Sequence, residues 1–166
     1  MQTRCMQALK MITAALLLLA ALFVAVLPAG AAERTADEIT LTVGVSDMQV
    51  DDETVSIADG VPILNNGRVY VPLRAVAEAF GADVAYEAAT GDVTITLDDT
   101  EVVMNTLASI YSVNGELRWM DMAPYINDYS RTMVPVRFVS DALGYSIDTS
   151  ADDAGNTVVT ITRAAA

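Results

Sequence analysis

The chain has 166 residues, a formal net charge of −13, no histidine and a single cysteine. The absence of histidine excludes a Ser-His-Asp triad and imidazole-ligated copper, zinc or iron. The acidic balance disfavours nucleic acid as a partner, because nucleic-acid binding depends on Lys and Arg side chains that neutralise phosphates.

The first 31 residues have the pattern of a signal peptide. Arg4 and Lys10 precede an apolar run over residues 11–27, and the small residues Ala29–Ala31 follow Pro28. A positive start, an apolar centre and a small-residue end predict export and cleavage. The alternative is an uncleaved anchor, because the run is marginally long enough to span a bilayer. We therefore expect a secreted or cell-envelope location, with membrane contact only through an uncleaved segment.

Cleavage would also remove Cys5 and Lys10, the only cysteine and the only lysine of the chain. A mature chain without these residues has no thiol nucleophile and no Schiff-base lysine. The sequence also shows no cofactor-binding motif, and we expect no cofactor. We expect residues 32–38 to be a flexible N-terminus, residues 39–163 to fold, and residues 164–166 to be a tail.

The expected folded part contains a repeat. Residues 68–81 read RVYVPLRAVAEAFG and residues 131–144 read RTMVPVRFVSDALG, 63 positions later (68 to 131). Each copy continues into a Val-Thr-Ile-Thr segment, at 93–96 and at 159–162. The pattern predicts one repeat over about 39–99 and a second over about 100–163.

Within the first repeat, the predicted elements follow in chain order. A turn at 50–53 and an extended segment at 61–65 precede a strand at 69–71. Pro72 suits the first position of a helix, which Leu73, Val76 and Phe80 continue at helical spacing and Gly81 ends. Strands at 83–86 and 92–97 then pair around a turn at 88–91.

The second repeat predicts the same order, with a hairpin turn at Asn114-Gly115 and a helix that begins at Pro135 and stops at Gly144. Helices of two to three turns are stable only when packed on a sheet. The predicted fold class is α+β, with antiparallel strands, one short helix per repeat and two pseudo-equivalent repeats in one compact domain.

These motifs resemble the copper amine oxidase N-terminal-like family, also called stalk domains. The resemblance rests on Gly67-Arg68, Val71-Pro72-Leu73-Arg74, Glu78 and Gly81-Ala82-Asp83-Val84, and it covers roughly residues 39–162. It implies an α+β fold and an extracellular setting of the kind found in Gram-positive, spore-forming bacteria. It implies no oxidase activity, because that chemistry belongs to a separate catalytic domain with histidine ligands for copper.

The recurring charged residues of the motif allow two interpretations. Arg74 and Glu78 are four residues apart on one predicted helix, and Arg137 and Asp141 are four apart on the other. The arginines can act as clamps for an anion or a sugar carboxylate. The structural interpretation is that the recurring arginines pin the strand to the helix in each repeat. The motif residues assigned to this structural role are Arg68, Pro72, Arg74, Glu78, Gly81, Arg131, Pro135, Arg137, Asp141 and Gly144.

Aromatic residues gather in one region of the second repeat. Trp119, Tyr111, Tyr125 and Tyr129 are candidates for stacking on a sugar or contacting a partner, and the alternative is core packing. Asp148, Asp152, Asp153 and Asn156 form an oxygen-rich segment that can bind calcium or be a solvated acidic loop.

The sequence favours a non-catalytic envelope module that binds a cell-wall glycan or a protein partner. A purely structural spacer is the alternative, and a carboxylate-based hydrolase is a third, because the chain's 22 acidic residues always leave some pair close together.

Overall fold

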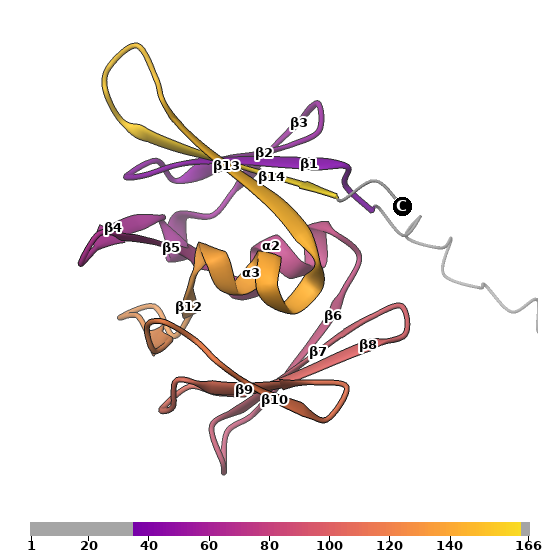
Figure 1. Ribbon diagram of the computed structural model, residues 1–166. Coiled ribbons are helices and arrows are strands. Elements are labelled where there is room, and N and C mark those ends of the chain that lie inside the picture. The colour runs from indigo at the N-terminus through magenta and orange to yellow at the C-terminus, as the bar shows by residue number, and fades with distance from the viewer. Residues whose placement is uncertain (1–34, 164–166) are drawn as a thin grey trace, which may run out of the picture. The chain divides into compact units, whose positions relative to one another are not determined.

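A computed structural model describes residues 35–163, in which three antiparallel sheets surround two short helices. Figure 1 shows one five-stranded sheet above the helices and another below them. The fold class is therefore α+β. The predicted signal peptide and the tail at residues 164–166 lie outside the described residues. Within those residues, no helix has the length and apolar character needed to cross a membrane.

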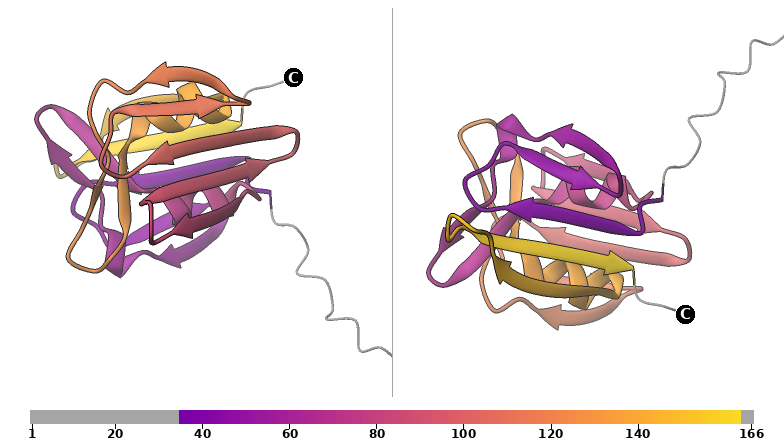
Figure 2. Two further views of the ribbon diagram at one scale, coloured as in Figure 1. Left: turned by 90° about the horizontal axis from the view of Figure 1, so that it is seen from below. Right: turned by 90° about the horizontal axis from the view of Figure 1, so that it is seen from above.

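The first five-stranded sheet, the terminal sheet, joins strands from the two ends of the described chain. Its order is β13-β14-β1-β2-β3, and β14 pairs antiparallel with β1 from Glu38↔Thr162 to Thr42↔Val158. Figure 2 shows the yellow and indigo strands side by side. The strands are β1 (Glu38–Thr42), β2 (Asp47–Val50), β3 (Glu53–Ser56), β13 (Tyr145–Ala151) and β14 (Thr157–Arg163).

The second five-stranded sheet, the meander sheet, is continuous in sequence and has the order β10-β9-β8-β7-β6. The predicted hairpin at Asn114-Gly115 is confirmed, with φ values of 50° and 83° that both residues tolerate. The strands are β6 (Asp83–Glu87), β7 (Asp92–Leu97), β8 (Thr100–Asn105), β9 (Ile110–Val113) and β10 (Glu116–Trp119).

A four-stranded central sheet lies between them and joins the two motif segments. In it β5 pairs antiparallel with β12, with Val71 opposite Val134. Both valines have 0% exposure. The strands are β4 (Ile63–Asn65), β5 (Arg68–Pro72), β11 (Tyr125–Ile126) and β12 (Thr132–Pro135), and the 3₁₀ turn η1 (Ala58–Gly60) precedes β4.

The two helices are α2 (Leu73–Ala79) and α3 (Val136–Leu143). The prediction that each begins at proline is wrong by one residue, because Pro72 and Pro135 are the last residues of their strands. Proline restricts φ but not ψ, and ψ values of 108° and 133° keep both residues extended. Gly81 follows the C-cap of α2 with φ of 86°, and Gly144 is itself the left-handed C-cap of α3.

The core forms where both helices pack against the inner faces of the sheets. Phe80 and Tyr145 stack with ring centroids 4.0 Å apart, and Tyr111 meets Phe138 edge-on at 5.0 Å. The fully buried positions of the sheets follow the period-2 pattern, as in β7, where Val93 and Ile95 alternate with less buried residues.

The structure differs from the prediction at the start of the folded part. Ala36, expected in a flexible segment, is 2% exposed, and its N–H donates to the carbonyl of Ala79. The N–H groups of Asp37 and Glu38 both donate to the Asp51 carboxylate. The folded part therefore begins before residue 39, because these backbone groups have partners that are distant in sequence.

Candidate functional site

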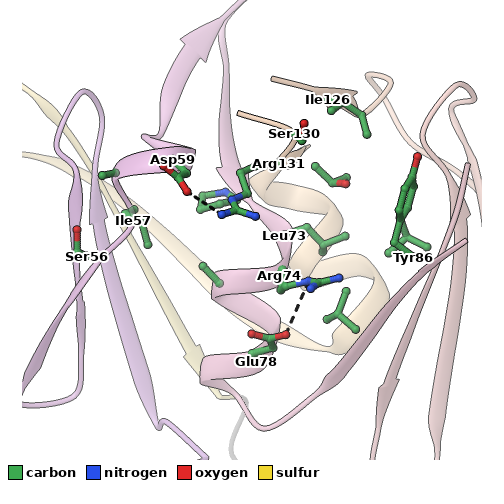
Figure 3. A pocket seen from close by; sticks show the side chains of 17 residues that line it. Ser56, Ile57, Asp59, Leu73, Arg74, Glu78, Tyr86, Ile126, Ser130 and Arg131 are labelled. Atoms are coloured by element: carbon green, nitrogen blue, oxygen red, sulfur yellow. Dashed lines mark hydrogen bonds and ion pairs between the residues drawn. The ribbon is translucent and has the colours of Figure 1, made fainter. Parts of the chain in front are cut away.

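A cleft of about 570 Å³ opens beside helix α2 (Figure 3). We call it the arginine cleft. Its volume lies within the range of about 300–1,000 Å³ that is usual for small-molecule sites. Its walls come from β3, η1, β5, α2, β6, β7 and the chain from β11 to β12, and include Ser56, Ile57, Asp59, Leu73, Arg74, Glu78, Val84, Tyr86, Ile126, Ser130, Arg131 and Thr132.

Helix α2 contributes a loosely held guanidinium group to this cleft. The Nε atom of Arg74 is 3.8 Å from the Oε1 atom of Glu78, and both side chains are about half exposed. That separation is too long for a hydrogen bond. Figure 3 shows Arg74 directed across the cleft toward the side that carries Tyr86. The Arg74 N–H groups have no hydrogen-bond partner among residues 35–163.

The second guanidinium group of the cleft has a hydrogen-bonded carboxylate partner. The Nη2 atom of Arg131 donates to the Asp59 carboxylate at 2.7 Å. Asn127 fixes the same segment, because its side-chain amide donates to the Asp59 carbonyl at 2.7 Å while its Oδ1 accepts the N–H groups of Tyr129 and Arg131. The position of Arg131 is therefore set by the fold.

The corresponding arginine of the first motif makes a mirrored contact. Arg68 is paired with Asp121, which lies in the second predicted repeat, whereas Arg131 is paired with Asp59 of the first. The interpretation that these arginines pin their strands to α2 and α3 is wrong for both residues, because Asp59 lies in the 3₁₀ turn η1 and Asp121 lies in the segment before β11. The two ion pairs link the predicted halves of the chain to each other.

A second, smaller hollow of about 140 Å³ lies beside α3 and is lined by Tyr111, Trp119, Met120, Asp121, Arg137, Phe138 and Asp141. This volume lies below the range of about 300–1,000 Å³ that is usual for small-molecule sites.

Edge strand β10 exposes apolar side chains beside this hollow. Leu117 and Trp119 are 70% and 76% exposed. They lie on the face of the meander sheet opposite to Arg118, since successive side chains of a strand alternate. We call the exposed side chains of Leu117 and Trp119, together with the free backbone edge of this strand, the β10 strip.

The hydrogen-bond pattern of the hairpin leaves the backbone of this strand open. A two-residue turn makes Val113 and Glu116 a hydrogen-bonded pair, so the N–H and C=O groups of Leu117 and Trp119 point away from β9. The bond from the N–H of Met120 to the carbonyl of Ser109 continues this alternation. Within the described residues, β10 has no neighbour on its other side.

The structure separates the predicted aromatic residues. Tyr111 is 3% exposed, and burial raises the pKa of its hydroxyl, with the charge of Asp141 adding to the effect. Tyr125 is half-buried with its ring centroid 5.2 Å from that of Tyr70. Tyr129 is exposed in the segment between β11 and β12. Only Tyr111 and Trp119 line the same hollow, so the four residues do not form one stacking platform.

The predicted pair on α3 does not form. Among residues 35–163, Arg137 has no ion pair with Asp141 or with another acid. Asp141 instead accepts a bond from the Ser140 hydroxyl to its carboxylate and one from Arg118 to its carbonyl. The two helices therefore hold their arginines differently, although the motif is shared.

The acidic segment near residue 152 is organised as a turn. The carboxylate of Asp152 accepts bonds from the N–H groups of Ala154 and Asn156 and from the Asn156 side chain, which lowers its pKa. Asp148 lies within strand β13, not in the loop. No group of three His, Cys, Asp or Glu residues among those described is placed to hold a metal ion.

Several residues of the arginine cleft were not predicted from the sequence. Tyr86 and Val84 share the face of β6 that is turned toward the core, which the period-2 pattern of this strand could have indicated. Ile126, Ser130 and Thr132 come from another part of the chain, and no local signal joins them to α2. Their proximity depends on the pairing of β5 with β12.

The comparison with known families agrees with the fold. The copper amine oxidase N-terminal domain family matches residues 49–160, so the chain belongs to this family. The N-terminal domain of this family is a non-catalytic module. No curated protein matches the chain.

Proposed function

We propose that this chain is a non-catalytic module of the cell envelope that binds another envelope component through the β10 strip. The observation that carries the proposal is an open strand edge flanked by exposed Leu117 and Trp119. Exposed aromatic side chains are frequent anchors of protein interfaces, and an open edge accepts an added strand.

A protein partner that supplies an extended strand fits this surface best. The N–H and C=O groups of Leu117 and Trp119 offer backbone pairing, and their side chains offer apolar contact on one face. The net charge of −13 favours a neutral or basic partner, because like charges repel at long range.

A cell-wall glycan is the second candidate, because the exposed ring of Trp119 can stack on a sugar face. The adjacent hollow holds Asp121, Arg137 and Asp141 as polar groups, but it is small. A spacer without any ligand is the remaining alternative, and such a protein would not be retained on envelope material.

Two matched variants distinguish these candidates. Leu117→Ala and Leu117→Pro both remove the leucine side chain, but only proline removes the outward N–H. We expect a strand-adding partner to be lost with Leu117→Pro and with Trp119→Ala, and to be partly retained with Leu117→Ala.

The measurement is retention of the protein on isolated cell wall before and after protease treatment of the wall. Retention that survives the protease and is lost only with Trp119→Ala would identify the glycan. Equal retention of wild type and all three variants would refute a contact at β10.

We further propose that residues 1–31 are a cleaved signal peptide and that residues 39–163 contain two copies of one sequence unit. The motif recurrence supports the copies, together with a helix that follows Pro72 in one segment and Pro135 in the other. N-terminal sequencing of the exported protein tests cleavage. A mature chain that begins at Met1 would contradict it.

A further inference from the structure

We propose that the arginine cleft is a binding site for a carboxylate attached to an apolar or aromatic group, recognised by Arg74. This site is separate from the β10 strip, and the proposal does not depend on the function assigned to that strip. Such a ligand can be a small organic acid or the C-terminal residue of a peptide, which share this chemistry.

Arg74 has hydrogen-bond donors available in the cleft. A guanidinium group has five N–H donors and matches a carboxylate in two parallel hydrogen bonds. The contact with Glu78 at 3.8 Å satisfies none of them by a hydrogen bond, and about half of each side chain is exposed. An exposed pair of this kind contributes little, so a ligand carboxylate can replace Glu78 at low cost.

Arg131 differs from Arg74 in its contacts. Its short bond to Asp59 and the bonds made by Asn127 hold it in the wall of the cleft. Arg131 therefore already has a hydrogen-bonded carboxylate partner, while Arg74 has none in the described part of the chain and its donors are available to a ligand. Figure 3 shows both side chains in the same hollow.

The remaining wall of the cleft carries both apolar and hydroxyl side chains. Tyr86 and Ile126 are 46% and 42% exposed, although both are large apolar side chains that line the cleft. Ser130 and Thr132 add hydroxyl groups. The cleft therefore combines apolar side chains with charged and hydroxyl groups, and a ligand that fills it needs an apolar part beside its carboxylate.

The acidic charge of the whole chain does not prevent this binding. At physiological ionic strength, interactions between exposed charges decay over about 8 Å, so the groups within the cleft decide the local potential. Among the cleft residues, the two negative charges of Asp59 and Glu78 balance the two positive charges of Arg74 and Arg131. Neutralising Glu78 would therefore leave the cleft net positive.

The test compares two probes on the full chain by NMR titration. N-acetyl-phenylalanine carries a carboxylate beside an aromatic group, and N-acetyl-phenylalanine amide is its neutral counterpart. We expect the acid to bind about tenfold more tightly than the amide, as expected for one charge-assisted pair. A short peptide that has uncharged side chains and ends in phenylalanine with a free carboxylate distinguishes the two ligand sources. If this peptide binds more tightly than N-acetyl-phenylalanine, the ligand is assigned as a peptide C-terminus.

Three variants test whether the preference for the acid depends on Arg74. Arg74→Gln should remove the preference for the acid, and Glu78→Gln should strengthen acid binding because it frees Arg74. Arg137→Gln is the matched control, since it changes the equivalent motif arginine on α3 outside this cleft, and it should leave the preference unchanged. Equal binding of acid and amide, no binding of either, or an acid preference that survives Arg74→Gln would overturn the proposal.

Discussion

Replacing Tyr145 with phenylalanine should make the protein more stable. Tyr145 is 5% exposed, and its hydroxyl is a buried side-chain group without a hydrogen-bond partner among residues 35–163. The ring is well placed, since it stacks on Phe80 at 4.0 Å with an interplanar angle of 21°. The substitution keeps this stacking and removes only the hydroxyl.

The magnitude follows from the cost of an unsatisfied group. A buried polar group that loses its bond to water and gains no partner costs about 1–3 kcal/mol. The small void left by the oxygen offsets part of the gain. We therefore expect Tyr145→Phe to raise the free energy of unfolding by about 1 kcal/mol.

Tyr70→Phe is the matched control, because the same atom is removed from a hydroxyl that has a partner. The Tyr70 hydroxyl donates to the carbonyl of Ala123 at 3.0 Å. Losing this bond should lower the free energy of unfolding by about 0.5–1.5 kcal/mol. The two substitutions are chemically identical and should have opposite signs.

Urea unfolding followed by far-ultraviolet circular dichroism is the suitable assay. The single tryptophan, Trp119, is 76% exposed, and its fluorescence is therefore a poor reporter of the core. Both variants should shift the midpoint without changing the slope m. If Tyr145→Phe destabilised the protein as much as Tyr70→Phe does, the hydroxyl of Tyr145 would have a partner in solution and the reasoning would be refuted.

Three further predictions concern other parts of the structure. Gly60→Ala should destabilise the protein in the same urea assay, because a Cβ atom there would lie 2.6 Å from the Cβ of Pro72; an unchanged midpoint would contradict this packing. A double-mutant cycle on Arg131 and Asp59 should give a coupling below about 1 kcal/mol that decreases with salt, because both side chains are half exposed; a larger, salt-independent value would contradict surface screening. Hydrogen bonds lower the pKa of Asp152, so the stability that its carboxylate contributes is present above the unfolded-state pKa and is lost as pH falls through the folded-state pKa. Asp152→Asn should therefore reduce stability at neutral pH, and the stabilities of the variant and the wild type should converge in acid. A difference that stays constant across pH would refute this assignment.

Local elements of this protein are largely readable from its sequence. The hairpin at Asn114-Gly115 was predictable because few residues tolerate positive φ at both turn positions. The helix after Pro72 and its end before Gly81 were predictable to within one residue, since proline and glycine act on the backbone at their own positions. The family match over residues 49–160 also rests on such local motifs.

The partners of the motif arginines were not predictable. Arg74 and Arg137 have the same spacing to an acid, yet only Arg74 lies near its predicted partner. Arg68 and Arg131 reach acids in the opposite half of the chain. Side-chain pairing depends on which segments the fold brings together, and helical spacing constrains only neighbours on the same helix.

The sequence by itself determined the turns and the two short helices, because these elements depend on residues near one another in the chain. The tertiary structure alone decided that β14 pairs with β1 and that β5 pairs with β12. Those pairings join segments that are far apart in sequence, and their specificity comes from buried contacts such as Val71 with Val134. These long-range pairings place Arg131 beside the arginine cleft. The local hairpin of β9 and β10, in contrast, is enough to direct the free backbone groups of β10 outward.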